Sequence, residues 1–449
     1  MIVTKFGGTS VGNASAIGRL VEIVRSRREE RPVVVVSALA GVTDALLDLA
    51  RQVQSGDAAA LDAALARLVA RHTDTAQVLG AGRARAEIVR DAAALLDELH
   101  LALGRKLRPQ ELDALAGRGE LWSSRLVAAA LEDGGLAATW VDARTVVITD
   151  DRFTRATPHV RVVAERARAC LKPLAESGRI PVTQGFIGAT AEGIPTTLGR
   201  GGSDFTAALL GAALEVGRVE IWTDVDGLMT ADPRIVPSAR TLAEASYEEA
   251  AELATFGARV LHPATAQPLV RAGIPIVVLN STQPERPGTT IEPSAILERM
   301  GDSPVRSISW KRGITVVNIR APRMLGAFGF LRALFEVFER HEVVVDVLAS
   351  SEVSVSLTIE ERSHLGAVMR DLAELGEVSV DSGRAVVAVV GIGLRHTPGL
   401  AARLFRAVQP ANVEVISQGA SAINMTFVVR EEDGPGVVQR LHQEFFGTC

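Results

Sequence analysis

The 449-residue sequence lacks the features that mark several protein classes. It has no run of about 18 to 20 apolar residues that could span a membrane, and its start, Met1 to Lys5, has neither the basic nor the apolar segment of a signal peptide. The 48 basic and 53 acidic residues leave a net charge of −5, so no overall positive charge attracts nucleic acid or an anionic membrane. We therefore predict a cytoplasmic protein without a nucleic-acid or membrane partner.

Cysteine is nearly absent. Cys170 and Cys449 are too few for a disulfide framework or a multi-cysteine metal site. The simplest interpretation is a buried, inert thiol at Cys170 and a residue of the tail at Cys449.

Lysine is scarce as well: Lys5, Lys106, Lys172 and Lys311 are four of 48 basic residues, which leaves 48 − 4 = 44 arginines. None of them follows a glycine, so the phosphate-binding pattern G-x-x-x-x-G-K-[ST] is missing. The dinucleotide pattern G-x-G-x-x-G is missing too, because Asp204 and His396 stand where its third glycine belongs. A nucleotide site in this chain must therefore use neither of these two glycine-rich patterns. Because the chain strongly favours arginine, a position that has lysine instead is a candidate for a specific role.

What the sequence does contain, over about its first 290 residues, is an alternation of short β-branched runs with longer helical stretches. This pattern predicts an open α/β sheet with helices on both faces. Residues 43–132 have almost no β-branched clusters and many alanines, which predicts a helical subdomain. The predicted strands are Ile2 to Phe6, Pro32 to Ser37, Thr139 to Asp142, Ile180 to Gly185, Val219 to Thr223 and Pro275 to Asn280.

Prolines at 284, 287 and 304 predict a linker near 292–304, and the chain beyond it repeats itself at a spacing of 70 residues. Gly329 corresponds to Gly399, and Val316 to Val386. Each copy reads strand, glycine-led helix, strand, strand, helix, which suits two ferredoxin-like α/β modules. The predicted domains are 1–292, 305–382 and 383–449, and the strand near 305–310 is a candidate for completing the last one.

Two segments of the sequence combine glycine with charge. In residues 5–10, two glycines would let backbone amides approach an anion, and Lys5 would neutralise a transferred phosphoryl group. The alternative is an exposed lysine beside a glycine turn. In residues 196–206, three glycines lead through Ser203 and Asp204, the predicted N-cap, into a helix at 205–214, and Arg200 suits a carboxylate. Here the alternative is that Asp204 only caps that helix.

Thr223, Asp224 and Arg234 come after another predicted strand and are placed for a nucleotide. The alternative is that Asp226-Gly227 and Asp232-Pro233 in the same stretch are only turns. His262 precedes a proline and marks a helix end, so we assign it no catalytic role.

These segments resemble the aspartate kinase family over essentially the whole chain. The C-terminal half is most similar to its monofunctional, lysine-sensitive branch. The resemblance implies a three-layer amino-acid-kinase domain of the carbamate-kinase-like type and two ACT modules. It also implies transfer of the ATP γ-phosphate to the β-carboxylate of L-aspartate, the first step towards lysine, threonine and methionine. The matching segments are 5–11 (KFGGTSV), 119–121, 184–188 (QGFIG), 196–206 (TTLGRGGSDFT), 222–224, 230–234, 256–263, 328–331, 345–346 and 351–354.

The resemblance implies site residues as well. Lys5 and Asp204 would be catalytic, Arg200 would hold the α-carboxylate of aspartate, and Glu120 would lie near its α-amino group. The remaining aspartate contacts would be Ser37, Thr43, Gly201, Gly202 and Ser203. ATP, which brings its own Mg²⁺, would contact Lys5, Phe6, Gly7, Gly8, Thr223, Asp224, Met229, Arg234, Arg259 and Val260.

The resemblance further implies a homodimer joined through residues after about 305, with a tetramer as the alternative. L-Lysine is the expected effector, with threonine as the other possibility, bound between the first modules of two subunits. Its contacts would be Met324, Phe330, Leu331, Val344, Val345, Asp346, Ser351 and Glu352.

The chain departs from its relatives at four positions. Arg259 replaces a usual lysine and Met229 a frequent tyrosine near the nucleotide, while Ala327 and Val344 replace serines that are common near the effector. A kinase for glutamate or acetylglutamate is one alternative function, but the tandem repeat argues against it. A sensor that has lost catalysis is another, yet the catalytic residues implied by the resemblance are present.

Overall fold

A computed structural model of the chain describes residues 1–256, 263–293, 304–326, 328–360 and 365–447. The chain divides into two compact units. Among the described residues, no helix combines the length and the apolar character that crossing a membrane requires. The first unit contains Met1–Leu228, Ala243–Tyr247 and Val260–Leu297, and the second contains Met229–Leu242, Glu248–Arg259 and Glu298–Cys449.

The main sheet of the first unit has eight strands in the order β3-β4-β2-β1-β7-β9-β10-β8. Neighbours from β3 to β9 are parallel, whereas β10 is antiparallel to β9. All six predicted strands are confirmed with ends shifted by at most two residues, while the short strands β8 and β10 were not predicted. The strands are β1 (Ile2–Phe6), β2 (Pro32–Val36), β3 (Ala138–Trp140), β4 (Ile180–Gln184), β7 (Val219–Thr223), β8 (Glu244–Ser246), β9 (Ile276–Asn280) and β10 (Thr289–Glu292).

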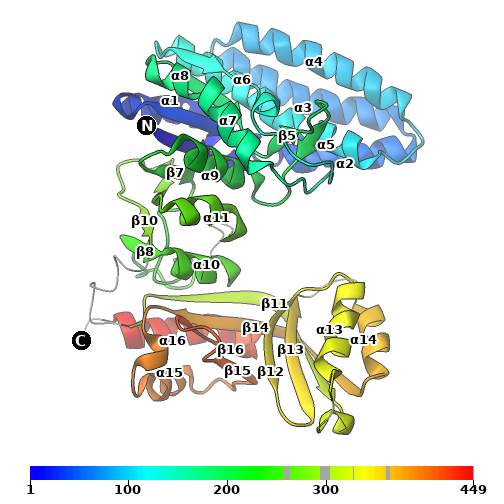
Figure 1. The fold of residues 1–449 in the computed structure, drawn as a ribbon, viewed down its shortest axis with the longest axis vertical. Helices are drawn as coiled ribbons and strands as arrows, with labels where there is room; N and C mark the ends of the chain where they lie inside the picture. The colour runs from blue at the N-terminus through cyan, green and yellow to red at the C-terminus, as the bar shows by residue number, and fades with distance from the viewer. Residues whose placement is uncertain (257–262, 294–303, 327, 361–364, 448–449) are drawn as a thin grey trace. The chain divides into compact units, whose positions relative to one another are not determined.

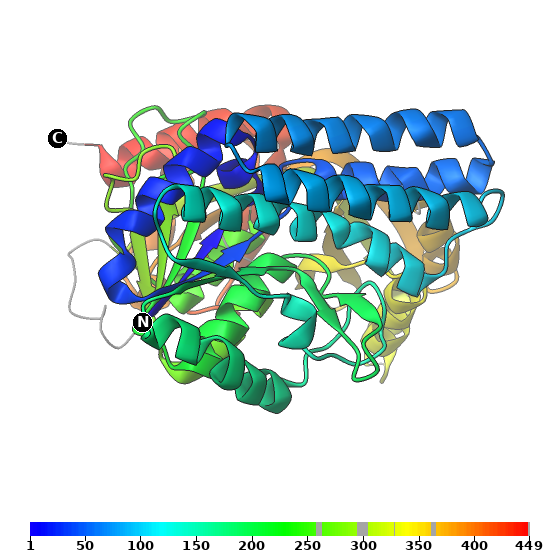
Figure 2. The same ribbon diagram turned by 90° about the horizontal axis from the view of Figure 1, so that it is seen from above.

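Helices cover both faces of this sheet (Figure 2). α6 (Arg118–Asp133) packs on β2, β3 and β4, with α1 (Ala14–Ser26) beside it. α9 (Gly202–Leu214) packs on β1, β2 and β7 from the other face. The three layers confirm the predicted fold class and explain why β1 and β2 are buried along their whole length. The other elements on the α9 side and beside it are α7 (Val160–Cys170), α8 (Lys172–Glu176), α11 (Pro263–Ala272), β5 (Ile187–Ala189) and β6 (Pro195–Thr197).

The predicted helical subdomain is also confirmed, and its long helices lie side by side in Figures 1 and 2. Its core includes the edge-on contact of His72 with Trp122, whose ring centroids are 5.1 Å apart. Burial lowers the pKa of His72 to about 4, so this histidine is a neutral core residue. Before α6 the subdomain contains α2 (Val42–Ser55), α3 (Ala58–Val78), α4 (Gly82–Leu101) and α5 (Pro109–Ala116).

The second unit contains a six-stranded antiparallel sheet in the order β12-β13-β11-β14-β16-β15. Its elements follow the predicted order of strand, helix, strand, strand, helix in each copy. Gly329 and Gly399, which the 70-residue register equates, both precede a helix with φ of 83° and 76°. This shared conformation confirms the repeat. The elements are β11 (Ser307–Arg320), α13 (Phe330–Arg340), β12 (Val345–Ser350), β13 (Ser354–Glu360), α14 (Leu365–Ala373), β14 (Glu377–Val390), α15 (Leu400–Val408), β15 (Val415–Gln418), β16 (Asn424–Arg430) and α16 (Gly434–Phe446).

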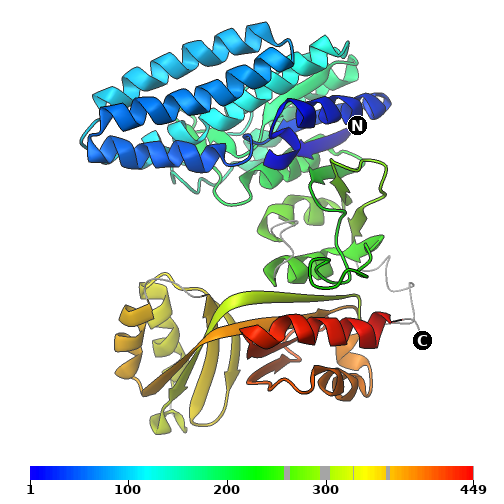
Figure 3. The same cartoon turned by 180° about the vertical axis from the view of Figure 1, so that it is seen from behind.

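The two longest strands, β11 and β14, each belong to both copies of the repeat. The first half of β11, Ser307 to Lys311, pairs with Val386 to Val390, and its second half, Ile314 to Arg320, pairs with β13 and the start of β14. The register shifts between Lys311 and Ile314. Figure 3 shows α16 lying along β11. The two copies are therefore parts of one continuous sheet.

Cys170 is exposed, which contradicts the interpretation of a buried thiol. It is the last residue of α7, whose buried stripe runs through Val163 and Ala167 to Leu171. Because successive helical residues point about 100° apart, Cys170 falls beside this stripe and faces solvent.

We predict opposite effects for two glycine-to-alanine substitutions in the first unit. A Cβ at Gly185, just after β4, would lie 2.6 Å from Cβ of Ser203 in α9, so Gly185→Ala should destabilise the fold by about 1–3 kcal/mol through overpacking. Gly18 lies within α1, and a Cβ added there would meet nothing within 4 Å, so Gly18→Ala should stabilise by about 0.5–1 kcal/mol. Urea unfolding of both variants checks this, and equal stabilities would contradict it.

Candidate active site

A cavity of about 510 Å³ opens at the carboxyl ends of β1 and β2, where open α/β sheets bind their ligands. The described residues reach it from five places: the end of β1, the segment after β2, helix α6, the turn after β4 that carries Phe186, and the glycine loop with the first turn of α9. All seven residues predicted to contact aspartate line it, together with Lys5, Gly8 and Asp204. The described residues that line it are Lys5, Gly8, Ser37, Ala38, Leu39, Ala40, Gly41, Thr43, Asp44, Glu120, Phe186, Gly199, Arg200, Gly201, Gly202, Ser203 and Asp204.

The ammonium group of Lys5 is held inside this cavity by Asp204. Lys5 Nζ lies 2.6 Å from Asp204 Oδ1, and the two side chains are 10% and 16% exposed. Lys5 comes from the central strand β1, and Asp204 from the first turn of α9, which packs on that strand. The sheet and the helix therefore place one positive charge where an anionic group could enter.

Glu120 also lines the cavity, but burial rather than an ion pair dominates the environment of its side chain. Its side chain is 3% exposed, and its Oε2 has no hydrogen-bond partner among the described residues. Burial raises the pKa of Glu120 to about 8, although hydrogen bonds from the backbone act in the other direction. Ionising a buried carboxyl group costs free energy unless a cation neutralises it, so this geometry favours a ligand that brings a cation.

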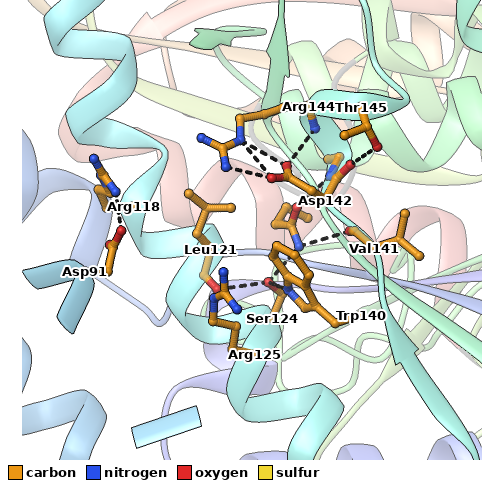
Figure 4. A network of polar contacts seen from close by, with 12 residues as sticks. Asp91, Arg118, Leu121, Ser124, Arg125, Trp140, Val141, Asp142, Arg144 and Thr145 are labelled. Carbon is orange, nitrogen blue, oxygen red and sulfur yellow. Dashed lines mark hydrogen bonds and ion pairs between the residues drawn. The ribbon is translucent and has the colours of Figure 1, made fainter. Parts of the chain in front are cut away.

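Helix α6, which carries Glu120, is fixed by hydrogen bonds from its own serines. Ser123 Oγ donates to the carbonyl of Ser37, 2.7 Å away, and so joins the helix to the loop after β2. Ser124 Oγ accepts from Trp140 Nε1 at 2.9 Å and from Gln184 Nε2 at 2.8 Å (Figure 4). These contacts tie α6 to β3 and β4 below the cavity.

The same helix is tied to the helical subdomain through Asp91 of α4. One oxygen of this carboxylate pairs with Arg118, as Figure 4 shows, and the other accepts from Trp122 Nε1 at 2.7 Å. Arg118 precedes Glu120 by two residues and Trp122 follows it by two, so Asp91 clamps the turn that presents Glu120.

The glycine loop differs from its predicted form at the start of α9. The helix begins at Gly202, and its N-cap is Gly201, with φ of 71° and no side-chain cap. The predicted capping by Ser203 and Asp204 is wrong, because both already lie in the helix and the Asp204 carboxylate pairs with Lys5. Arg200, between two left-handed glycines, is exposed at the rim of the cavity.

Sequence reasoning missed Asp113, which holds the strand before this loop. Its carboxylate accepts from the amide and hydroxyl of Thr197, at 3.0 and 2.7 Å, and from the amide of Thr154 at 2.8 Å. Burial raises the pKa of Asp113 against the effect of these hydrogen bonds. No motif surrounds Asp113, so only the fold reveals it.

The predicted phosphate loop is only partly available to an anion. The amide of Gly7 donates to the carbonyl of Trp222 at 3.0 Å, so it does not face the cavity. Gly8 lines the cavity, and a Cβ there would approach the carbonyl oxygen of Ala38 to 3.0 Å. Glycine at position 8 thus allows the close approach of the loops after β1 and β2.

Of the other residues predicted to bind the nucleotide, those that the structure describes do not line this cavity. Phe6 is fully buried and stacks on Trp222, with ring centroids 6.1 Å apart, and Thr223 Oγ1 donates to Asp224 at 3.2 Å. Arg234, which pairs with Asp232 at 2.7 Å, belongs to the second unit, as does Met229. Arg259, Val260 and His262 lie outside the described residues. Within the described ranges, no three His, Cys, Asp or Glu side chains are grouped so that they could hold a metal ion.

The residues predicted for the effector all lie in the first copy of the repeat. Met324, Phe330 and Val345 pack against its apolar core, whereas Leu331 and Val344 are 41% and 66% exposed. Asp346 is engaged in an ion pair, Ser351 is hydrogen-bonded to Ser354, and Glu352 is exposed. Ala327 lies outside the described residues.

Comparison with known proteins gives a consistent result. The pattern of the amino acid kinase family matches residues 1–280, and that of an ACT domain matches residues 387–445. Lysine-sensitive aspartokinase 3 of Escherichia coli (strain K12) is 38% identical over 99% of both chains. Two crystal structures of E. coli aspartokinase III, one with lysine and aspartate and one with aspartate and ADP, superimpose with TM-scores of 0.85 and 0.81. Their sequences are 38% and 37% identical to this one. Each match covers 99% of this chain, and the matches cover 99% and 100% of the two crystallised chains, respectively. The chain belongs to the aspartokinase family.

Proposed function

We propose that this protein transfers the γ-phosphoryl group of ATP to the β-carboxylate of L-aspartate and so begins the synthesis of lysine, threonine and methionine. The observation that carries the proposal is the cavity that combines the ammonium of Lys5, the buried acid of Glu120, one oxygen of which has no hydrogen-bond partner among the described residues, and the guanidinium of Arg200. These three groups complement a phosphate, an α-ammonium and an α-carboxylate. The aspartate and ADP bound by a solved relative support this pairing.

Each end of aspartate has a partner in the proposal. Arg200 at the rim binds the α-carboxylate through two parallel hydrogen bonds, and Glu120 binds the α-ammonium. Gly201, Gly202 and Ser203 at the start of α9, with Ser37 and Thr43 across the cavity, surround the acceptor. The β-carboxylate is then directed towards Lys5.

The chemistry needs positioning and charge neutralisation more than proton transfer. Because the β-carboxylate is already ionised at neutral pH, it attacks the γ-phosphorus without a general base. A bond forms between a carboxylate oxygen and phosphorus, and the bond from phosphorus to the β,γ-bridging oxygen breaks, leaving ADP. Lys5 neutralises charge on the transferred group, Asp204 holds Lys5 in place, and Mg²⁺ enters with the ATP phosphates.

The domain organisation and assembly are part of the proposal. Residues 1–292 would form the catalytic domain, and 305–382 and 383–449 the regulatory modules of a cytoplasmic homodimer or tetramer. The pairing of Ser307 to Lys311 with β14 supports assigning the strand near 305–310 to the last module. The exposed side chains of Leu325, Phe328 and Val344 support a partner surface on the first module.

The direct test is ATP consumption that depends on aspartate, with hydroxylamine trapping of the acyl phosphate. We expect Lys5→Ala to lower kcat by about 10²-fold or more, because it removes a preorganised charge next to the phosphoryl group. The KM for aspartate should change much less. A folded Lys5→Ala protein with nearly normal kcat would remove Lys5 from the proposed role.

The raised pKa of Glu120 predicts a pH dependence of aspartate binding. Below pH 8 the neutral acid must release a proton before it can bind the α-ammonium, so the KM for aspartate should fall about tenfold per unit as the pH rises towards 8 and then level off. Glu120→Gln should have a high KM without this dependence, while the other charged groups of the cavity, Lys5, Asp44, Arg200 and Asp204, are retained. An identical pH profile in both proteins would contradict the assignment.

We also propose feedback inhibition by L-lysine, bound between the first modules of two subunits. Gly329 presents the N-terminus of α13 to the α-carboxylate, and Asp346 and Glu352 hold the ammonium groups. Asp346→Ala should abolish inhibition by lysine. The measurement compares the rate of each enzyme with lysine to the rate of the same enzyme without lysine. A wild-type enzyme that ignores millimolar lysine, or an Asp346→Ala enzyme as sensitive as wild type, would show that this site is wrong.

A further inference from the structure

The carboxylate of Asp346 is already bound to a lysine of its own chain. Lys311 Nζ lies 3.0 Å from Asp346 Oδ2 and 2.8 Å from Glu360 Oε1. Lys311 is one of four lysines in a chain with 48 basic residues. A primary ammonium on a flexible stem therefore occupies the acid that the proposed effector would use.

The three side chains come from three neighbouring strands of one sheet. Lys311 is the last residue of β11 before its register shift, and Glu360 ends β13. Asp346 lies in β12 where the pairing with β13 is irregular, between Val345 and Leu348. Ile314 pairs with Glu360 and Val345 with Ile359, so the strand register places Lys311 and Asp346 at the same end of the sheet.

The ion pair between Lys311 and Asp346 is partly buried, which strengthens the attraction between the two charges. The side chains of Lys311 and Asp346 are 21% and 14% exposed, so water screens their attraction less than that of a surface pair. Burial alone would lower the pKa of Lys311, but the hydrogen bonds that its ammonium donates to Glu360 and Asp346 outweigh burial and raise the pKa. Lys311 therefore remains an ammonium throughout the pH range of an assay.

We propose that Lys311 is a tethered competitor of the effector for the carboxylate of Asp346. The inference rests on the proposed inhibition by lysine. Both cations are primary ammonium groups, and two ammonium groups beside one carboxylate repel each other and compete for its single negative charge. Lys311 therefore sets the concentration of free lysine that inhibits the enzyme, by requiring each incoming effector to displace it.

The test compares inhibition curves and lysine binding of the full-length enzyme with those of Lys311→Met, which keeps much of the stem and removes the charge. We expect the half-inhibitory concentration and the calorimetric Kd for lysine to fall about three- to tenfold, as expected for losing one partly buried competing ion pair. Lys311→Arg, which keeps a cation there, should stay close to wild type. Arg312→Met removes a charge from the exposed neighbouring residue and should leave both values unchanged.

The possible results distinguish competition by Lys311 from the proposed feedback inhibition by L-lysine. If wild-type enzyme is inhibited but Lys311→Met requires as much lysine or more, Lys311 is not a competitor, while lysine regulation stands. If wild-type enzyme neither binds lysine nor is inhibited by it, both ideas fail. Lys311→Gln serves as a second neutral variant should Lys311→Met unfold, as judged by circular dichroism, and the same fall in Kd is expected of it.

Discussion

The ion pair between Lys5 and Asp204 joins the two structural elements on which the site depends. Lys5 belongs to the central strand of the first sheet, and Asp204 belongs to the helix that packs on that strand. Removing either charge would leave the other buried without a partner, which is strongly destabilising. The pair therefore keeps an ammonium group inside the cavity until a phosphate offers it a second partner. Fold and chemistry depend on the same 2.6 Å contact.

Glu120 contrasts with this ion pair, because burial rather than a neighbouring charge dominates its pKa among the described residues. The cost of such a group must be offset elsewhere, and α6 is held by Asp91, Ser123 and Ser124 on three sides. These contacts keep the carboxylate in the cavity, where it would otherwise relax towards water. A site that pairs one cation internally and leaves one buried acid open favours a zwitterionic ligand, because the ammonium of such a ligand stabilises the ionised form of Glu120 and an anion alone does not.

The sequence was sufficient for features that depend on local pattern. Buried parallel strands, the helical subdomain and the repeat could all be predicted because periodicity and glycine conformation determine them. Features that depend on contacts between distant side chains could not be predicted. Examples are the hydrogen bond between Asp113 and Thr197, the ion pair of Asp204 with Lys5 in place of a helix cap, and the ion pair of Lys311 with Asp346. Each joins residues far apart in the chain or competes with a local alternative that a linear pattern favours equally.

The repeat itself shows that the two modules have diverged in charge. In the 70-residue register, Lys311 corresponds to Asp381, Asp346 to Ile416 and Glu360 to Arg430. The second copy thus has the opposite sign at two of these positions and no charge at the third, while its backbone order is unchanged. A cationic effector would find no free carboxylate at Ile416 and a repelling guanidinium at Arg430. Lys311 lies in the half of β11 that pairs with the second copy, yet its ammonium contacts the two acids of the first copy. A ligand that displaces Lys311 from Asp346 would therefore change a contact of β11, the strand that both modules share.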